Sequence, residues 1–122
     1  MQALILPHQP DQEYWFDEGC FILECANSPA DPALSIARAR VLPGGVTRWH
    51  LLHGITERYL IQSGRGVVEV GDLDAQEVGP GDVVIIPPGC RQRIRNSGET
   101  ELIFLALCSP RFQPEAYQDL EG

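Results

Sequence analysis

The sequence predicts an all-β fold, an antiparallel jelly-roll β-barrel. Short runs of apolar and β-branched residues recur along the 122 residues, and turns rich in glycine, proline and asparagine separate them at nearly even spacing. No stretch of helical length repeats its apolar residues about every 3.6 positions. Short, evenly spaced strands without helices are typical of sandwiches and barrels. A chain of this length can bury one hydrophobic core.

The expected elements follow one another without long interruptions. An N-terminal hairpin is expected from residues 14–16 and 20–26, with a loop at 27–32 after it. The remaining strands are expected at residues 35–42, 46–52, 57–62, 67–70, 77–78, 83–86, 92–95 and 102–108. The tail after Pro110 is expected to form a short helical turn around 114–120 or an irregular arm. We expect one domain, 1–122, with an arm and hairpin at 1–34, a barrel at 35–108 and a tail at 109–122.

Composition limits the partners and the location of the protein. The net charge is −8, and all nine basic residues are arginine, which argues against a nucleic acid or an anionic membrane as partner and favours a small-molecule ligand. Without lysine, Schiff-base chemistry by a side-chain amine is excluded. The four cysteines form no C-x-x-C pair, and the first residues lack the features of a signal peptide or a membrane span. A cytoplasmic protein with free thiols is therefore expected.

Residues 81–96 contain a Gly-Asp turn, an apolar strand, Pro-Pro-Gly and a second strand. This stretch resembles the second motif of the cupin superfamily, whose fixed positions are matched by Gly81, Pro87, Gly89 and Asn96. Gln92 stands where the motif has a histidine. The resemblance implies a jelly-roll barrel with a site in its interior.

Residues 44–64 resemble the first cupin motif in either of two registers. Counting from Gly44 places His50 at the first histidine position, Leu52 at the second, and Glu57 at the glutamate. Counting from Gly45 places His53 at the second histidine position instead. We favour the Gly44 register because it keeps a histidine at the first position.

Strand alternation predicts which side chains meet inside the barrel, because alternate residues point the same way. Three arginines in a row cannot lie in a dry interior without partners, so residues 91, 93 and 95 should face outward and Gln92 inward. Glu57 and Tyr59 share one face of their strand. His50, Glu57 and Gln92 should therefore converge, and a bulge near Gly54 would bring His53 to the same place.

Two functions follow from this convergence and stay open at this point. The first is a small metal-dependent enzyme, an oxygenase or isomerase, with Fe, Mn, Ni or Zn held by His50, His53, Glu57 and Gln92, and with Tyr59 as a catalytic phenol beside the metal. The alternative is a non-catalytic protein that binds a small ligand in a metal-free pocket, where the same side chains satisfy one another by hydrogen bonds.

A homodimer is also expected. A small open barrel exposes edge strands and apolar outer positions such as Leu60, and a second copy would cover them. The aromatic segment 14–16 is the expected covering or exchanged element.

Overall fold

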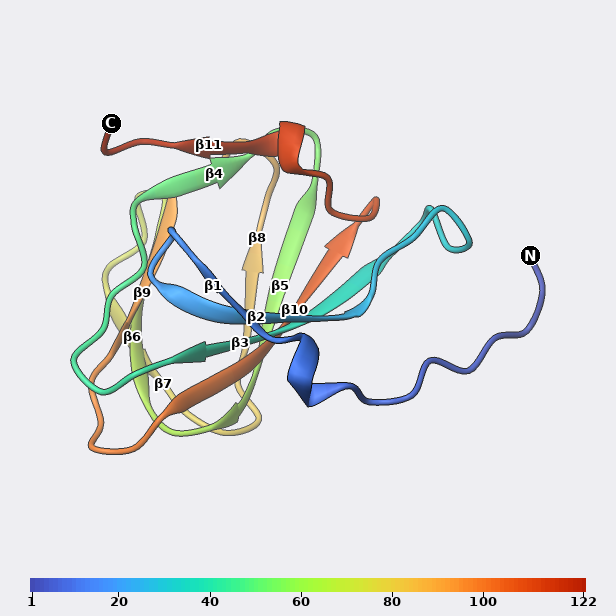
Figure 1. Cartoon of the computed structure of the whole chain (residues 1–122). Helices are drawn as coiled ribbons and strands as arrows, with labels where there is room; N and C mark the ends of the chain where they lie inside the picture. Colours follow the sequence, from blue (N-terminus) through green and yellow to red (C-terminus); the bar gives the residue numbers. More distant parts are fainter.

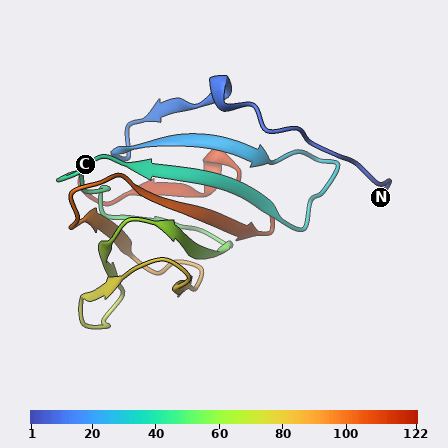
Figure 2. The same ribbon diagram turned by 90° about the horizontal axis from the view of Figure 1, so that it is seen from below.

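The computed structural model describes all 122 residues and confirms the all-β jelly roll. Two antiparallel sheets pack face to face (Figures 1 and 2), one of six strands in the order β1-β2-β3-β10-β5-β8 and one of five in the order β11-β4-β9-β6-β7. The strands are β1 (Tyr14–Phe16), β2 (Cys20–Ala26), β3 (Ser35–Val41), β4 (His50–Leu52), β5 (Thr56–Ser63), β6 (Gly66–Val70), β7 (Gln76–Val78), β8 (Val83–Ile86), β9 (Gln92–Asn96), β10 (Leu102–Ser109) and β11 (Tyr117–Asp119). Two single 3-10 turns complete the structure, η1 (Pro10–Gln12) and η2 (Pro114–Ala116).

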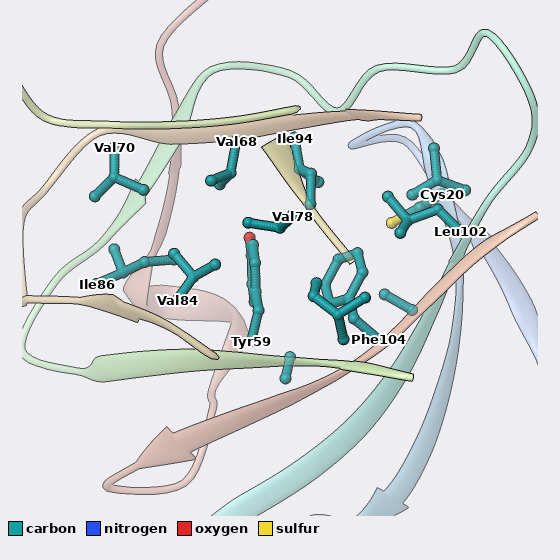
Figure 3. Close-up of a cluster of buried hydrophobic side chains, with 14 residues drawn as sticks. Cys20, Tyr59, Val68, Val70, Val78, Val84, Ile86, Ile94, Leu102 and Phe104 are labelled. Atoms are coloured by element: carbon teal, nitrogen blue, oxygen red, sulfur yellow. The ribbon is translucent and has the colours of Figure 1, made fainter. Parts of the chain in front are cut away.

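The core lies between the two sheets and follows from strict alternation along the strands. Every second residue of β10 is buried, and the same holds for β6 and for most of β5. Figure 3 shows how these inward side chains meet, with Val68, Val70 and Ile94 of the five-stranded sheet opposite Tyr59, Ile86 and Phe104 of the six-stranded sheet. On β9, Gln92 and Ile94 are fully buried, which confirms that the arginines of this strand face outward.

The structure differs from the expected elements at the edge of the five-stranded sheet. The strand expected at 46–52 is regular only from His50, because Val46 forms a single bridge to Arg95 and Thr47 bonds to the carbonyl of Ile94. In the tail, the helical turn is limited to η2, and β11 then pairs antiparallel with β4. β4 pairs with β9 only at His50, so most of its backbone N–H and C=O groups lack a partner in that strand. Pairing with β11 along residues 50–52 provides hydrogen-bond partners at the other edge of β4.

The outer face of the six-stranded sheet has apolar side chains. Leu60 pairs with Leu105 on one side and Val83 on the other, and Val83 and Ile85 on the edge strand β8 are mostly exposed. β1 pairs with β2 of its own chain. The homodimer stays a prediction, with this face as its expected contact surface. The chain has no helix with the length and hydrophobicity needed to cross a membrane.

Candidate functional site

A cavity of about 60 Å³ lies between the sheets at the end of the barrel where β4 and β11 run (Figure 1). It exists because small side chains line the inner face of the six-stranded sheet there. Ala37 of β3 pairs with Ala106 of β10, and both line the cavity. The ionisable side chains other than tyrosine around it are Glu18, Glu24, His50, Glu57 and Cys108, and hydroxyl groups come from Tyr14, Ser35 and Tyr117.

His50 begins β4 and is 2% exposed. Its Nδ1 lies 2.6 Å from the backbone oxygen of Arg48, and because a carbonyl oxygen only accepts hydrogen bonds, Nδ1 carries a hydrogen. Its Nε2 lies 2.7 Å from Oε1 of Glu18. Burial opposes protonation of the imidazole, but the hydrogen bond and the charge of Glu18 outweigh it and raise the pKa of His50. The contact with Glu18 therefore favours the protonated form of the His50 imidazole.

Glu18 is positioned by the turn between β1 and β2. The next residue, Gly19, has φ +114°, and a Cβ there would lie 2.7 Å from the backbone oxygen of Val46. Only glycine suits both the conformation and the close approach. The second carboxylate oxygen of Glu18 accepts a bond of 3.3 Å from the thiol of Cys20. This turn thus fixes an acidic side chain against His50 from the opposite sheet.

Glu57 lies on β5 and lines the same cavity. Burial, followed by the negative charge of Glu18, raises the pKa of Glu57 to about 7, while the His50, Gln92 and Cys108 side chains act to lower it. Oε2 accepts a long, weak bond of 3.8 Å from the Cys108 thiol, and Oε1 is buried without a hydrogen-bond partner. Nε2 of Gln92 is also buried without a partner, so the carboxyl group and the neighbouring amide are both unsatisfied. Near pH 7, the carboxyl group is divided between its acid and its base form.

Tyr59 and Gln92 lie behind the cavity in the hydrophobic core. The Tyr59 hydroxyl donates to Oε1 of Gln92, and the Tyr59 ring packs on Phe104 with 4.4 Å between centroids (Figure 3). Burial raises the pKa of Tyr59 well above its usual value, so the phenol stays protonated. Neither side chain lines the cavity. Gln92 nevertheless lies close enough to Glu57 to influence its ionisation.

His53 does not join the other predicted residues. Its side chain is exposed outside the barrel, and its Nε2 lies 2.6 Å from Oε1 of Gln118 on β11. The glycine after it, Gly54, produces no bulge that turns His53 inward, because β4 pairs through residues 50–52 and then ends. The structure thus brings His50, Glu57 and Gln92 together, as expected from the Gly44 register, and leaves His53 as a contact to the tail.

The donor atoms as they stand do not fit a metal ion. No three histidine, cysteine, aspartate or glutamate side chains are arranged to hold one. Gln92 directs its only ligand atom, Oε1, to Tyr59, and Nε2 of His50 faces Glu18. A metal would require Glu18 to release His50 and Gln92 to turn away from Tyr59.

Two residues that the sequence reasoning missed complete the site. Glu18 lies in the connection between the expected strands 14–16 and 20–26, where its sequence context indicates a turn and nothing more. Tyr117 lies on β11, and its ring stacks on the His50 imidazole with 5.1 Å between centroids and 21° between planes. Phe16 packs on the same tyrosine.

Comparisons with known proteins agree with this architecture. The sequence profile of the cupin domain matches residues 37–108. An uncharacterized protein of Methanocaldococcus jannaschii is 34% identical over 87 residues, which make up 71% of this chain and 69% of that protein.

Two solved structures show the fold at lower identity. The oxalate decarboxylase of Lactobacillus farciminis, in complex with formate, superposes with a TM-score of 0.76 at 23% identity over 88% of this chain. The chain spans 33% of the length of that enzyme. A nucleoside dehydratase from Streptomyces superposes with a TM-score of 0.77 at 16% identity, covering 96% of this chain and 92% of the dehydratase.

Proposed function

Since the chain belongs to the cupin family, we propose that it is an enzyme that moves protons on a small molecule by acid–base catalysis, with Glu57 as the base and His50 as the acid. The observation that carries the proposal is the Glu57 carboxyl group, which is buried in a cavity, has one unpartnered oxygen and a pKa near neutrality. A general base is most effective when its pKa lies near the working pH.

Glu57 takes the proton. Its Oε1 is buried and has no partner within hydrogen-bond distance, so a C–H or O–H group of a bound molecule, or the equally unpartnered Nε2 of Gln92, would complete it. Leaving a buried carboxylate oxygen without a partner is unfavourable, and a ligand hydrogen relieves this cost. The neighbouring Gln92 amide, held by Tyr59, keeps the carboxyl group from being driven entirely into its acid form.

His50 returns a proton. Its Nδ1–H is fixed by the Arg48 carbonyl and Nε2 is paired with Glu18, which favours the protonated ring. Donation to a substrate therefore requires Glu18 to release Nε2, the same movement that a metal would require. After donation, the neutral imidazole remains between the Arg48 carbonyl and Glu18. Tyr117 stacks on the ring and limits its rotation.

The pair suits isomerisation or loss of water. In a dehydration, Glu57 takes a proton from carbon, the bond between the neighbouring carbon and its hydroxyl oxygen breaks, and His50 protonates the departing oxygen, which leaves as water. In an isomerisation, the two groups remove a proton from one position of the substrate and supply one at another. Both reactions need no external oxidant or reductant, which the oxygenase prediction would require.

A metal-dependent alternative is favoured by one observation. A histidine whose Nδ1–H bonds to a backbone carbonyl while Nε2 faces a cavity has the orientation found in metal-binding histidines. At this site Nε2 meets Glu18, so the alternative needs the rearrangement described above.

Proton transfer can be detected before the substrate is known. The protein is incubated in deuterated water with a panel of small hydroxy and carbonyl compounds, with and without a chelator, and mass spectrometry measures deuterium uptake or loss of water. We expect turnover that survives the chelator, is lost in Glu57→Gln and His50→Gln, and persists in Glu99→Gln, which removes an exposed surface charge.

Two results would overturn this proposal. Turnover abolished by the chelator and restored by a divalent metal would favour the metal-dependent enzyme. Tight binding of a panel compound without exchange would favour the non-catalytic ligand-binding protein.

A further inference from the structure

The charged groups that line the cavity are mostly carboxylates. They belong to Glu18, Glu24 and Glu57, and His50 is the one lining side chain able to carry a positive charge. No arginine lines the cavity, and the neighbouring Arg48 pairs with Asp119 at 3.0 Å in an adjacent surface hollow. Glu18 is paired with His50, so Glu24 and Glu57 are the lining carboxyl groups without a paired cation, in a protein whose net charge is already −8.

Aromatic rings form much of the remaining wall. Tyr14 and Phe16 of β1, Phe112 of the tail and Tyr117 of β11 all line the cavity. Aromatic faces carry partial negative charge and attract cations, most strongly where water is excluded. Carboxylates and rings together therefore favour a positively charged ligand.

Glu24 lies at the mouth of this wall, on the inner face of β2. Glu24 is paired across the sheet with Ala37 of β3, and Ala37 is paired with Ala106 of β10. Two alanines therefore follow Glu24 across the inner face of this sheet. Glu24 is exposed at this edge of the cavity; partial burial of its carboxyl group raises its pKa against a hydrogen bond from Asn27, and no arginine or histidine acts on it. Its charge in turn raises the pKa of Tyr14, after burial, so the two side chains are neighbours. This places a carboxylate without a cationic partner beside an aromatic ring.

We infer that the substrate of the proposed enzyme is a small organic cation, a protonated amine whose charged end lies against Glu24 and Tyr14 while its reacting end meets Glu57. The inference rests on the proposed function for the role of Glu57, and its unpartnered Oε1 is an independent sign that a ligand completes the cavity. A carboxylate substrate such as oxalate would meet like charges at the mouth and at the base, with no arginine to receive it.

Three probes of similar size and different charge test the inference. Ethanolamine is a cation, n-propanol is its neutral isostere and glycolate is an anion. Binding to the full chain is measured by NMR titration at low and high salt. We expect ethanolamine to bind about tenfold more tightly than n-propanol and glycolate not to bind, with the preference reduced by salt. Glu24→Gln should remove the preference without changing n-propanol binding, and Glu99→Gln, its surface-charge control, should leave it unchanged.

The outcomes separate this inference from the proposed function. Equal binding of the three probes, or tighter binding of glycolate, overturns the cationic substrate. A preference for ethanolamine that is the same in Glu24→Gln overturns the assignment of the charged end. If amines bind as expected but none exchanges protons with deuterated water, the cation site stands and the enzyme proposal fails. If exchange is seen only with neutral or anionic compounds, the enzyme proposal stands and this inference fails.

Discussion

The two ends of the barrel are built by the same strands and have opposite properties. At the closed end, Ile61 of β5, Ile94 of β9 and Phe104 of β10 interlock in an apolar core. Toward the open end, the same three strands present Glu57, Gln92 and Cys108. Inward orientation is thus common to both ends, and the size and polarity of successive inward residues decide whether the space is filled or becomes a site.

The two ends differ in how their inward side chains affect the stability of the fold. Large apolar residues at the closed end stabilise the fold by burial. At the open end, small residues such as Ala37 and Ala106 leave space, and buried polar groups such as Oε1 of Glu57 lack partners. Such groups reduce stability and are retained where they act on a ligand.

The largest expected effect comes from a truncation at the closed end. Ile61 is 1% exposed, so Ile61→Ala should lower the free energy of unfolding by about 4 kcal/mol through lost burial and a new void. Cys108→Ala, at the open end, should lower it by about 1 kcal/mol or less, because its neighbourhood already holds a cavity. Chemical denaturation measures both values. Equal losses would show that the two ends do not differ in packing.

The next effect concerns the pH dependence of stability. The pKa of Glu57 rises from 4.5 to about 7 on folding, so between these values the folded state keeps a proton that the unfolded state has released. The free energy of unfolding should therefore fall as pH rises through this window, by roughly 3 kcal/mol from this group. Denaturation curves of Glu57→Gln across the window should be flatter than those of the wild type.

The matched control for this pH effect is Glu99→Gln, which removes an exposed carboxylate outside the cavity. It should keep the wild-type slope. An unchanged slope in Glu57→Gln would show that the carboxyl group has an ordinary pKa and would remove the main support for its role as base.

The smallest expected effect is a change in metal affinity, which tests the metal-dependent alternative. Gln92 and His50 are cross-strand neighbours, so Gln92→His would place a second imidazole beside the first and remove the acceptor of Tyr59. We expect titration calorimetry with Mn(II), Ni(II) and Zn(II) to show no tight binding to the wild type and binding about tenfold stronger or more in Gln92→His. Tight wild-type binding that is lost in both His50→Ala and Glu57→Ala would establish the metal-dependent enzyme instead.

The fold and half of the site follow from local patterns. Turn residues and alternation locate most strands, and the arginines at 91, 93 and 95 settle that Gln92 points inward. The same alternation, counted from Gly44, brings His50 to Glu57 and Gln92. These predictions hold because burying unpaired charge is costly whatever the tertiary arrangement.

The rest depends on how the two sheets face each other. Glu18 meets His50 only because the β1–β2 turn of one sheet reaches the first residue of β4 in the other, a relation that no local pattern contains. β11 has three residues and pairs with a strand about 65 positions earlier, so propensity alone does not reveal it. Tyr59 points inward as expected but lies in the core, because Glu57 occupies the position nearer the cavity.

β11 also covers one side of the cavity. This strand is short and lies at a sheet edge, where it pairs with β4 and is further held by the contacts of Gln118 with His53 and of Asp119 with Arg48. Segments of this kind open at a much lower free energy than the whole protein, so amide hydrogens there exchange with solvent while the core stays protected. Tyr117 lines the cavity and stacks on His50, so the segment that completes the site is also a short edge strand, and amide exchange at 117–119 is expected to be faster than in β5 and β10.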